Sequence, residues 1–345
     1  MKRGIEILHN FKRASVLVIG DLVMDHFIWG KVRRISPEAP VPVVEVNSES
    51  LMLGGAANVV NNIRSLGGKV LVCGVVGRDD TGKNLVREMS LKGIPSDGVI
   101  IEESRPTSVK TRVIAHSQQV VRFDREKKDK IHLDTMKTIL DYAKRKISSV
   151  DIIILSDYAK GVISQELAEE IISLARKEGK PVAVDPKVNH FDFYKDATIV
   201  TPNNDEASQA SGVDIENDAS LMRAGEVLLN KLGGDAVLIT RGEHGMSLFE
   251  NSGEITHIPT VAKEVYDVSG AGDTVIGAVA LAIASGASFK EAAVVSNFAA
   301  GIVVGKVGTA TVTPEELKRA MEQANRVGVK TAKTATRSPR SKSER

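Results

Sequence analysis

The 345-residue sequence has a single cysteine and few aromatic residues. With Cys73 alone, no disulfide can form within the chain, and a zinc site rich in thiolates cannot be built. Cys73 lies in the apolar run of residues 70–76, which favours a buried small hydrophobic side chain over a reactive thiol. No stretch approaches the roughly 20 apolar residues that span a bilayer, and no apolar signal core precedes residues 16–19. These absences argue against a membrane-spanning role or a membrane partner and indicate a cytoplasmic chain.

Excess charge of one sign is also scarce over most of the chain. Residues 327–345 hold six lysines and arginines against one acid, a net charge of +5, so residues 1–326 carry −3 of the total of +2. This tail is rich in Ser, Thr and Ala with little to bury, and it is predicted to be disordered. A non-specific contact with polyanions is one interpretation of it. A solvated terminus is preferred, and no specific nucleic-acid partner is expected.

Short β-branched runs alternate with amphipathic stretches, which is typical of a mostly parallel sheet flanked by helices. Strands are expected at residues 16–20, 69–76, 151–156, 181–185, 198–201 and 236–240, and helices at 57–66, 165–177 and 221–232. Several of these strands end in polar residues. Ligands of such sheets bind beyond the carboxyl ends of the strands, so the site is expected there.

Two segments break this alternation and are predicted to form β structure. Residues 27–47 contain three prolines and an apolar run, and residues 107–124 resemble a hairpin with its turn near 116–118. Together they predict a small sheet outside the main layer. A lid over the substrate is the functional interpretation, and an edge extension of the core sheet is the alternative. Free strand edges on such a lid favour a homodimer that pairs through it.

The most informative motif is Gly270-Ala271-Gly272-Asp273, which is followed by an apolar run at residues 275–284. Small residues just before a helix leave N–H groups directed at one point, and the helix dipole adds positive potential there. An anion site is therefore predicted. Asp273 taken alone would be interpreted as complementing the dipole. Beside a phosphate site, it is placed to act as the base that accepts a proton from an attacking hydroxyl.

A second motif, Gly54-Gly55, opens a helix that carries Asn58 in its first turn. The glycines allow a ligand to approach the main chain closely, and Asn58 offers both a donor and an acceptor, which suits a ligand rich in hydroxyl groups. An ordinary glycine-capped helix start is equally compatible with this motif taken alone.

Five motifs resemble, in this order, those of the ribokinase-like (pfkB) carbohydrate kinases: residues 20–25, 54–58, 201–206, 240–242 and 267–273. The resemblance covers roughly residues 14–318. It implies a ribokinase-like three-layer α/β/α sandwich over residues 1–326, with a mostly parallel central sheet and a small β lid. It also implies transfer of a phosphoryl group from ATP to a sugar hydroxyl, with Mg²⁺ and with a monovalent cation such as K⁺ as an optional further ion.

Within this family, four segments are most similar to kinases of D-glycero-β-D-manno-heptose 7-phosphate in lipopolysaccharide precursor synthesis: residues 34–43, 118–124, 156–162 and 185–187. That similarity implies phosphorylation of the anomeric hydroxyl to give the 1,7-bisphosphate. A phosphorylated substrate needs cationic anchors, and Lys160 and Lys187 follow predicted strand ends. A kinase of another sugar and a catalytically silent sugar sensor are the alternatives. The presence of both Asp273 and Glu206 argues against the sensor.

The resemblance assigns a role to each candidate residue. The implied catalytic residues are Asp273 as base, with the anion hole formed by Gly270, Ala271 and Gly272. The implied magnesium residues are Asn203 and Glu206, acting partly through water. The implied ATP-side residues are Asn203, Thr240, Gly242, Gly245, Ser269 and Asn297. The implied substrate residues are Asp25, Gly54, Gly55, Asn58, Arg122, Asp157, Lys160 and Lys187.

One departure concerns the C-terminal part. Many relatives carry a nucleotidyltransferase domain with an H-x-G-H motif, and none of the seven histidines here has that spacing. The last helix is expected to begin at Thr313-Pro314 with a capping box. A kinase-only chain is therefore expected, with adenylyl transfer carried out by another chain.

Overall fold

The computed structural model describes residues 2–116, 118–262, 264–327 and 332–336. Its centre is a ten-stranded sheet in the order β14-β13-β12-β11-β10-β9-β8-β1-β4-β5. The strands from β11 to β5 in this order run parallel, whereas β12, β13 and β14 are antiparallel to their neighbours. Their bounds are β1 Ser15–Gly20, β4 Lys69–Val76, β5 Val99–Ile101, β8 Ile152–Ser156, β9 Val182–Asp185, β10 Ile199–Val200, β11 Ala236–Thr240, β12 Met246–Glu250, β13 Glu254–Ile258 and β14 Lys333–Thr336.

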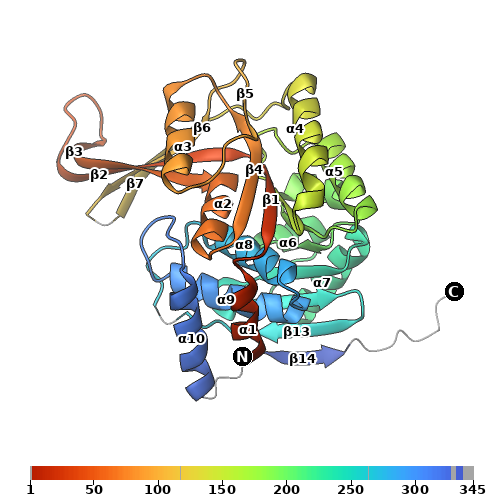
Figure 1. Cartoon of the computed structure of the whole chain (residues 1–345). Helices are drawn as coiled ribbons and strands as arrows, with labels where there is room; N and C mark the ends of the chain where they lie inside the picture. Colours follow the sequence, from red (N-terminus) through yellow and green to blue (C-terminus); the bar gives the residue numbers. More distant parts are fainter. Residues whose placement is uncertain (1, 117, 263, 328–331, 337–345) are drawn as a thin grey trace.

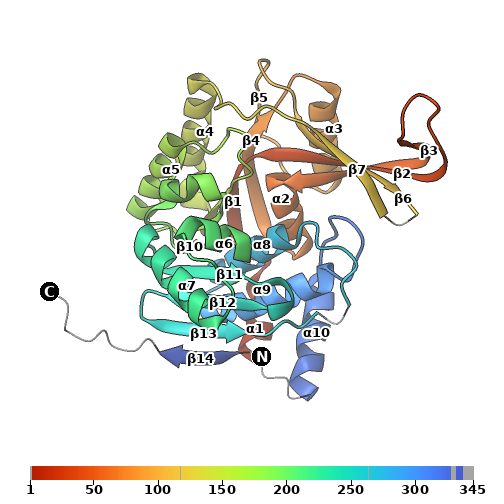
Figure 2. The ribbon, with the colours of Figure 1, turned by 180° about the vertical axis from the view of Figure 1, so that it is seen from behind.

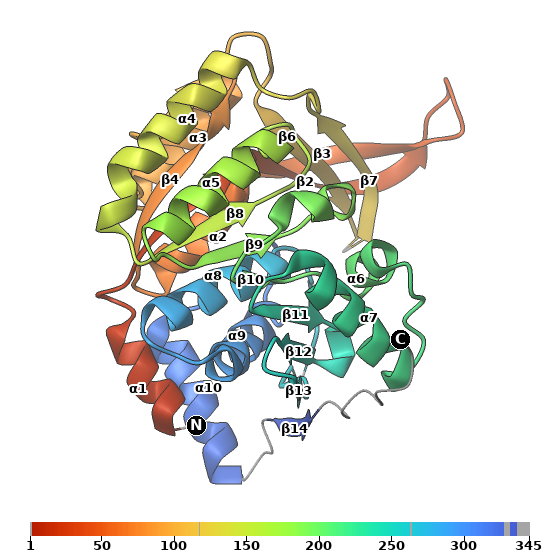
Figure 3. The same cartoon turned by 90° about the vertical axis from the view of Figure 1, so that its right-hand side faces the viewer.

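Helices cover both faces of this sheet, because alternate residues of the buried strands point to opposite sides. In β1, Val16 and Val18 pack into one hydrophobic cluster, whereas Leu17 and Ile19 pack into the other. The first cluster includes residues of α1 Lys2–Asn10, α2 Ala56–Ser65, α3 Asp80–Leu91, α8 Ala271–Ala284, α9 Phe289–Val303 and α10 Pro314–Val327. The second includes residues of α4 Leu133–Lys146, α5 Gln165–Lys177, α6 Asn204–Ser211 and α7 Asp218–Leu232 (Figure 3). The predicted three-layer α/β/α sandwich is thereby confirmed.

A separate four-stranded sheet forms the lid and extends beyond the edge of the main body (Figure 1). Its order is β3-β2-β6-β7, with bounds β2 Leu22–Ile35, β3 Pro42–Gly55, β6 Ser108–Ala115 and β7 Gln118–Arg125. The lid is wider than the sequence predicts. β2 begins two residues after β1 ends, and β3 runs directly into α2, so the lid is joined to the strand ends where the site was expected.

The predicted disorder of residues 327–345 is wrong for Lys333–Thr336. This segment forms β14 and pairs antiparallel with β13 at the edge of the main sheet (Figure 2). The open edge of β13 offers backbone hydrogen bonds, and Thr334 Oγ1 accepts a further bond of 2.6 Å from Lys290 Nζ. Residues 328–331 and 337–345 of the predicted tail lie outside the described residues.

The predicted start of the last helix is confirmed. Thr313 Oγ1 accepts from the amide of Glu316 at 3.2 Å, and Glu316 Oε2 accepts from the amide of Thr313 at 2.9 Å, which is a capping box. Among the described residues, no helix has both the length and the apolar character needed to cross a bilayer.

Candidate active site

The anion site predicted from the glycine motif lies at the start of α8. Gly270 precedes the helix with a φ of 77°, in the left-handed region, and a Cβ there would lie 2.7 Å from Asn58 Nδ2. No side chain within the described residues caps this helix end, and the amide of Ala271 donates to the carbonyl of Val268 at 3.2 Å, so the next amide, that of Gly272, is the first one available to an anion. Ser269 lies just outside and donates its amide to Asp267 Oδ1 at 2.8 Å. The fold therefore places a site of positive potential directly beside Asp273.

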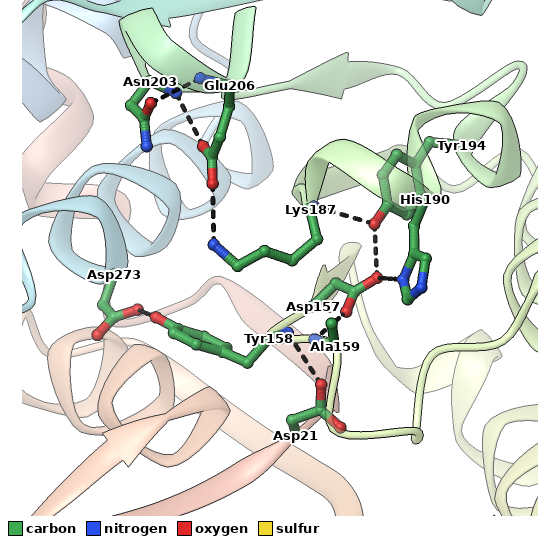
Figure 4. Close-up of polar contacts among 10 residues, drawn as sticks. All are labelled: Asp21, Asp157, Tyr158, Ala159, Lys187, His190, Tyr194, Asn203, Glu206 and Asp273. Carbon is green, nitrogen blue, oxygen red and sulfur yellow. Dashed lines mark hydrogen bonds and ion pairs between the residues drawn. The ribbon is translucent and has the colours of Figure 1, made fainter. Parts of the chain in front are cut away.

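Asp273 is buried in the first turn of α8, and two donors hold its carboxylate. The hydroxyl of Tyr158 donates to Oδ1, and Asn58 Nδ2 donates to Oδ2 at 2.7 Å (Figure 4 shows the first contact). Burial raises the pKa of Asp273 to about 6, and the two hydrogen bonds oppose that rise. At neutral pH the group is thus ionised, yet basic enough to accept a proton.

Asn58 belongs to a buried polar ladder between α2 and α8. Asn62 Nδ2 donates to Asn58 Oδ1 at 3.3 Å, and the hydroxyl of Thr274 donates to Asn62 Oδ1 at 2.9 Å. The sequence predicts Asn58 as a substrate ligand, but its side chain has no exposed surface. Its amide donates to the carboxylate of Asp273, and its contact with substrate stays a prediction.

The loop after β8 is fixed by two buried carboxylates (Figure 4). Asp21 accepts from the amides of Tyr158, Lys160 and Val162 at 2.9, 3.1 and 3.0 Å. Burial, followed by repulsion from Asp157, raises the pKa of Asp21 to about 6. Its three amide partners show that this carboxylate is a structural anchor of the loop.

Asp157, the second carboxylate, was predicted to contact substrate, and the structure instead turns it inward. Its Oδ2 accepts from His190 Nδ1 and from the hydroxyl of Tyr194, both at 2.6 Å, and its Oδ1 accepts from the amide of Ala159 at 2.7 Å. The side chain is essentially inaccessible. It therefore ties the loop to the 3₁₀ segment Val188–Tyr194.

The predicted metal pair forms a helix cap (Figure 4). Asn203 caps α6 and accepts from the amide of Glu206 at 2.9 Å, while Glu206 Oε2 accepts from the amide of Asn203 at 3.0 Å. Glu206 Oε1 accepts from Lys187 Nζ at 2.9 Å. Burial lowers the pKa of Lys187, but the ion pair with Glu206 outweighs burial, and the pKa is raised.

A further acid, Asp185, lies at the end of β9, close enough to Asp273 and Glu206 for their charges to interact. Burial, together with repulsion from Asp273 and Glu206, raises the pKa of Asp185 well above its usual range. No group of three His, Cys, Asp or Glu side chains in the described chain is arranged to hold a metal ion alone. Mg²⁺ favours one or two carboxylates completed by water and phosphate oxygens. Asp185 and Glu206 fit that requirement, because their charges repel each other and a cation between them would relieve the repulsion.

A cavity of about 690 Å³ borders the N-terminus of α8. Four of the six predicted ATP-side residues line it, Thr240, Gly242, Gly245 and Asn297, together with Ala271 and Gly272 of the predicted anion hole. Its size and its largely apolar wall suit a nucleobase. Asn297 Nδ2 donates to the carbonyl of Pro259 at 2.8 Å, which fixes this side chain in the wall. Packing also requires a glycine at position 245, because a Cβ there would lie 2.0 Å from the carbonyl oxygen of Ile258.

Close to Asp273, one face of the lid alternates acids and cations. The register pairs Asp25 of β2 with Lys110 of β6, and Lys110 with Asp124 of β7. Arg112 binds Asp25 Oδ1, and Arg122 makes a bidentate pair with Asp124 at 2.9 and 3.0 Å. Lys160 Nζ lies 2.6 Å from Glu126 Oε2. The predicted residues Asp25, Arg122 and Lys160 thus share one charged region.

The diglycine serves this region by making room for a carboxylate. A Cβ on Gly54 would lie 2.4 Å from Asp25 Oδ2, and Gly55 has a φ of 56° with the carbonyl oxygen of Asp21 2.6 Å from its Cβ position. The close approach expected at these glycines is therefore to the protein's own acids.

The model of the "pfkB family carbohydrate kinase" matches residues 13–316. The chain belongs to this family. The predicted class of enzyme, a phosphotransferase with an alcohol acceptor, is thereby confirmed.

A curated relative and two solved structures agree with this assignment. The chain is 50% identical over 303 residues to "Bifunctional protein HldE" of Geobacter sulfurreducens, covering 88% of this chain and 62% of that protein. This pfkB kinase chain therefore spans about three fifths of that relative. Ribokinase of Arabidopsis thaliana, solved with ribose and ATP, has a TM-score of 0.71 and 20% identity over 90% of this chain and 99% of its own. Phosphofructokinase-2 of Escherichia coli, solved with potassium, has a TM-score of 0.75 and 18% identity over 90% and 99%.

Three residues of the kinase site were not among those selected from the sequence: Tyr158, Lys110 and Asp185. The sequence did indicate Lys110, because Lys110 and Arg112 are two residues apart on a strand and so share a face. It also indicated Asp185, which lies at the end of a predicted strand. The contact of Tyr158 with Asp273 joins residues 115 positions apart, and no local pattern indicates it.

Proposed function

We propose that this protein transfers the γ-phosphoryl group of ATP to the anomeric hydroxyl of D-glycero-β-D-manno-heptose 7-phosphate, with Mg²⁺. The observation that carries the proposal is the position of Asp273. This clamped carboxylate lies in the helix turn whose Ala271 and Gly272 line a nucleotide-sized cavity, and it is close enough to the lid for the charges of Asp25 and Lys110 to act on it. Similarity to the heptose 7-phosphate kinases in residues 34–43, 118–124, 156–162 and 185–187 supports the choice of sugar.

The proton and the phosphoryl group have defined destinations in this mechanism. Asp273 takes the proton of the sugar hydroxyl as its oxygen forms a bond to the γ-phosphorus, and the bond from that phosphorus to the bridging oxygen of ADP breaks. The bridging oxygen keeps the electron pair and leaves as ADP. The first-turn amide of Gly272 and the positive end of the α8 dipole stabilise charge on the transferred group.

Mg²⁺ would be held by Asp185 and Glu206 with water and phosphate oxygens, and it supplies neutralisation of charge on the triphosphate. The ion pair of Lys187 with Glu206 orients this carboxylate. A monovalent cation such as K⁺ is proposed as an additional activator, to be tested in the same assay.

The phosphate already present on the sugar would be recognised by Lys110, Arg112, Arg122 and Lys160. Lys110 is largely buried, and burial lowers its pKa, as does repulsion from Lys160 and the two arginines. Cations gathered closely enough to repel one another gain stability from an incoming anion. A neutral sugar would not supply it, which favours a phosphorylated substrate.

A substrate panel tests the reaction and the substrate together. Purified protein is incubated with ATP and Mg²⁺ and with heptose 7-phosphate, unphosphorylated heptose, other sugar phosphates or ribose. ADP release is measured, and the phosphorylated carbon of the product is identified by ³¹P NMR. We expect the highest kcat/KM with heptose 7-phosphate and phosphorylation at C1. Preference for another sugar would replace the substrate, and sugar binding without ADP release would favour the sensor.

We further propose a homodimer formed through the lid. β7 is an edge strand exposed along its whole length, and the lid exposes the apolar side chains of Ile35, Val46, Val121 and Phe123. A second copy of the same sheet offers matching edge hydrogen bonds and apolar area. Sedimentation should show a dimer for the wild type and a monomer for Phe123→Asp. Leu133→Asp, on the equally exposed start of α4, is the matched control that should stay dimeric.

The proposed compartment is the cytoplasm, where ATP is available. A chain with one cysteine that is buried requires no oxidising environment.

A further inference from the structure

Tyr158 bridges the base and the two cations on its ring. Its hydroxyl donates to Asp273 Oδ1 (Figure 4). Lys110 Nζ of the lid lies 4.8 Å from the centre of its ring, and Lys187 Nζ of the core lies 5.7 Å from it. Both distances lie within the range of a cation–π contact. One side chain thus contacts the base, the lid and the lysine that pairs with Glu206.

The loop that carries Tyr158 is held more firmly than a simple connection requires. Besides the three amide bonds to Asp21, Arg105 Nη1 donates to the carbonyl of Lys160 at 3.0 Å and Nη2 donates to the carbonyl of Asp129. Ala159 has a φ of 53°, in the left-handed region that non-glycine residues rarely adopt. Such strain persists only where the surroundings impose it, and it gathers at functional sites.

The hydroxyl of Tyr158 completes a clamp on the carboxylate of Asp273. Asn58 fixes Oδ2 from the buried side, so Tyr158 is the donor that sets the orientation of the oxygen on the loop side. We propose that Tyr158 is a positioning residue, which holds the carboxylate of Asp273 in the orientation for proton transfer and couples it to Lys110 of the lid. This inference rests on the proposed function of Asp273 as the base.

The pH behaviour of this clamp follows from the groups around Asp273. Asp25 of β2 and Asp185 of β9 repel its negative charge, and Lys110 of β6 attracts it. Asn58 and Tyr158 donate hydrogen bonds to the ionised form and so lower its pKa, against the larger effect of burial. Removing the hydroxyl of Tyr158 should therefore make the base easier to protonate.

The variant Tyr158→Phe tests the proposal, because it removes the hydroxyl and keeps the ring between the two lysines. We expect kcat to fall on the order of 10- to 100-fold, since misplacing a catalytic group by about 1 Å has effects of this size. KM for ATP should not change. The acid limb of the kcat profile should move to higher pH, which a merely structural role would not cause.

Tyr142→Phe is the matched control. Tyr142 is also buried and donates to a carboxylate, Asp97 Oδ2 at 3.1 Å. It lies on α4, and within the described residues it has no hydrogen bond to the lid or to Asp273. This control should keep the wild-type kcat and pH profile. An unchanged acid limb in Tyr158→Phe, or an equal shift in Tyr142→Phe, would overturn the proposal.

Should Tyr158→Phe fail to fold, 3-fluorotyrosine placed at position 158 provides the test. Its more acidic hydroxyl donates more strongly, so the acid limb should move to lower pH, and an unchanged limb would again overturn the proposal. The two hypotheses can fail separately. A wild-type protein without sugar-dependent ADP release refutes the proposed function. An active wild type whose Tyr158 variants keep the same kcat and pH profile refutes only the role of Tyr158.

Discussion

Replacing Asp273 by asparagine should remove turnover and, at the same time, stabilise the fold above pH 6. Asparagine has nearly the same shape as the carboxylate. It can present its oxygen to Asn58 Nδ2 and its amide N–H to the hydroxyl oxygen of Tyr158, so both contacts of the buried group remain possible. It cannot accept a proton. Loss of a general base typically lowers kcat on the order of 10²- to 10⁴-fold.

The gain in stability follows from the pKa of Asp273. Burial raises this pKa from 3.8 to about 6, so the folded protein binds the proton more tightly than the unfolded chain does. The stability contributed by the neutral group is complete below pH 3.8 and is lost as the pH rises through 6. Above that range the ionised carboxylate costs about 3 kcal/mol, at about 1.4 kcal/mol for each tenfold change in proton affinity.

Thermal unfolding of the two proteins at a series of pH values measures this difference. At pH 8 the variant should melt higher by roughly 5 °C, and the gap should close as the pH approaches 4. Activity of the wild type should fall about tenfold for each pH unit below 6, where the base is protonated. ATP affinity, measured by calorimetry, should be nearly unchanged. A variant that melts lower at pH 8, or that retains normal turnover, would refute the assignment of Asp273 as a buried base.

Three further substitutions separate the parts of the site. Gly272→Ala adds a Cβ that meets nothing within 4 Å, so the melting temperature should not change. KM for ATP should rise, because the added Cβ would lie where the α8 N-terminus approaches phosphate. An unchanged KM would remove Gly272 from the anion site. Gly54→Ala places a Cβ 2.4 Å from Asp25 Oδ2, so KM for the sugar should rise and stability should fall by about 1–3 kcal/mol, whereas normal sugar kinetics would argue against Asp25. Lys110→Met should raise KM on the order of 10-fold or more for a phosphorylated sugar, because a hydrogen bond to a charged group contributes about 1.5–3 kcal/mol; an equal change for a neutral sugar would contradict phosphate recognition.

The central sheet could be predicted from the sequence because its strands are buried on both faces. Residues 236–239, for example, are all apolar and buried, and the observed β11 Ala236–Thr240 has the predicted bounds. The lid was predicted less well. β2 Leu22–Ile35 begins inside a motif that was interpreted as a site segment, and its pairing with β6 is parallel and distant in sequence. The strand at Lys333–Thr336 was missed, because only the open edge of β13 favours it over a solvated tail.

Within the site, sequence reasoning located the chemistry better than the contacts. A glycine motif before a helix indicates an anion site through backbone geometry alone, and the structure places Gly270 and Asp273 accordingly. Whether a polar side chain faces a ligand or another side chain depends on packing. Asn58 and Asp157 were both predicted as substrate ligands, yet their partners are Asp273 and His190, which lie 215 and 33 residues away. Spacing along the chain carries no information about such pairs.

The distribution of charge around Asp273 suggests how the two phosphorylated substrates would be kept apart. On one side, Asp185 and Glu206 repel each other, so a bare triphosphate there would add to the repulsion unless a divalent cation accompanied it. In the lid, Arg112 and Lys160 lie close enough to Lys110 to repel its charge. Such a group of cations suits a phosphate that carries no metal ion. A sugar phosphate is thus disfavoured beside the acids and metal-bound ATP beside the cations. On the proposed function, the sugar hydroxyl then lies between the two groups of charges, next to the carboxylate of Asp273, whose oxygens accept hydrogen bonds from Tyr158 and Asn58.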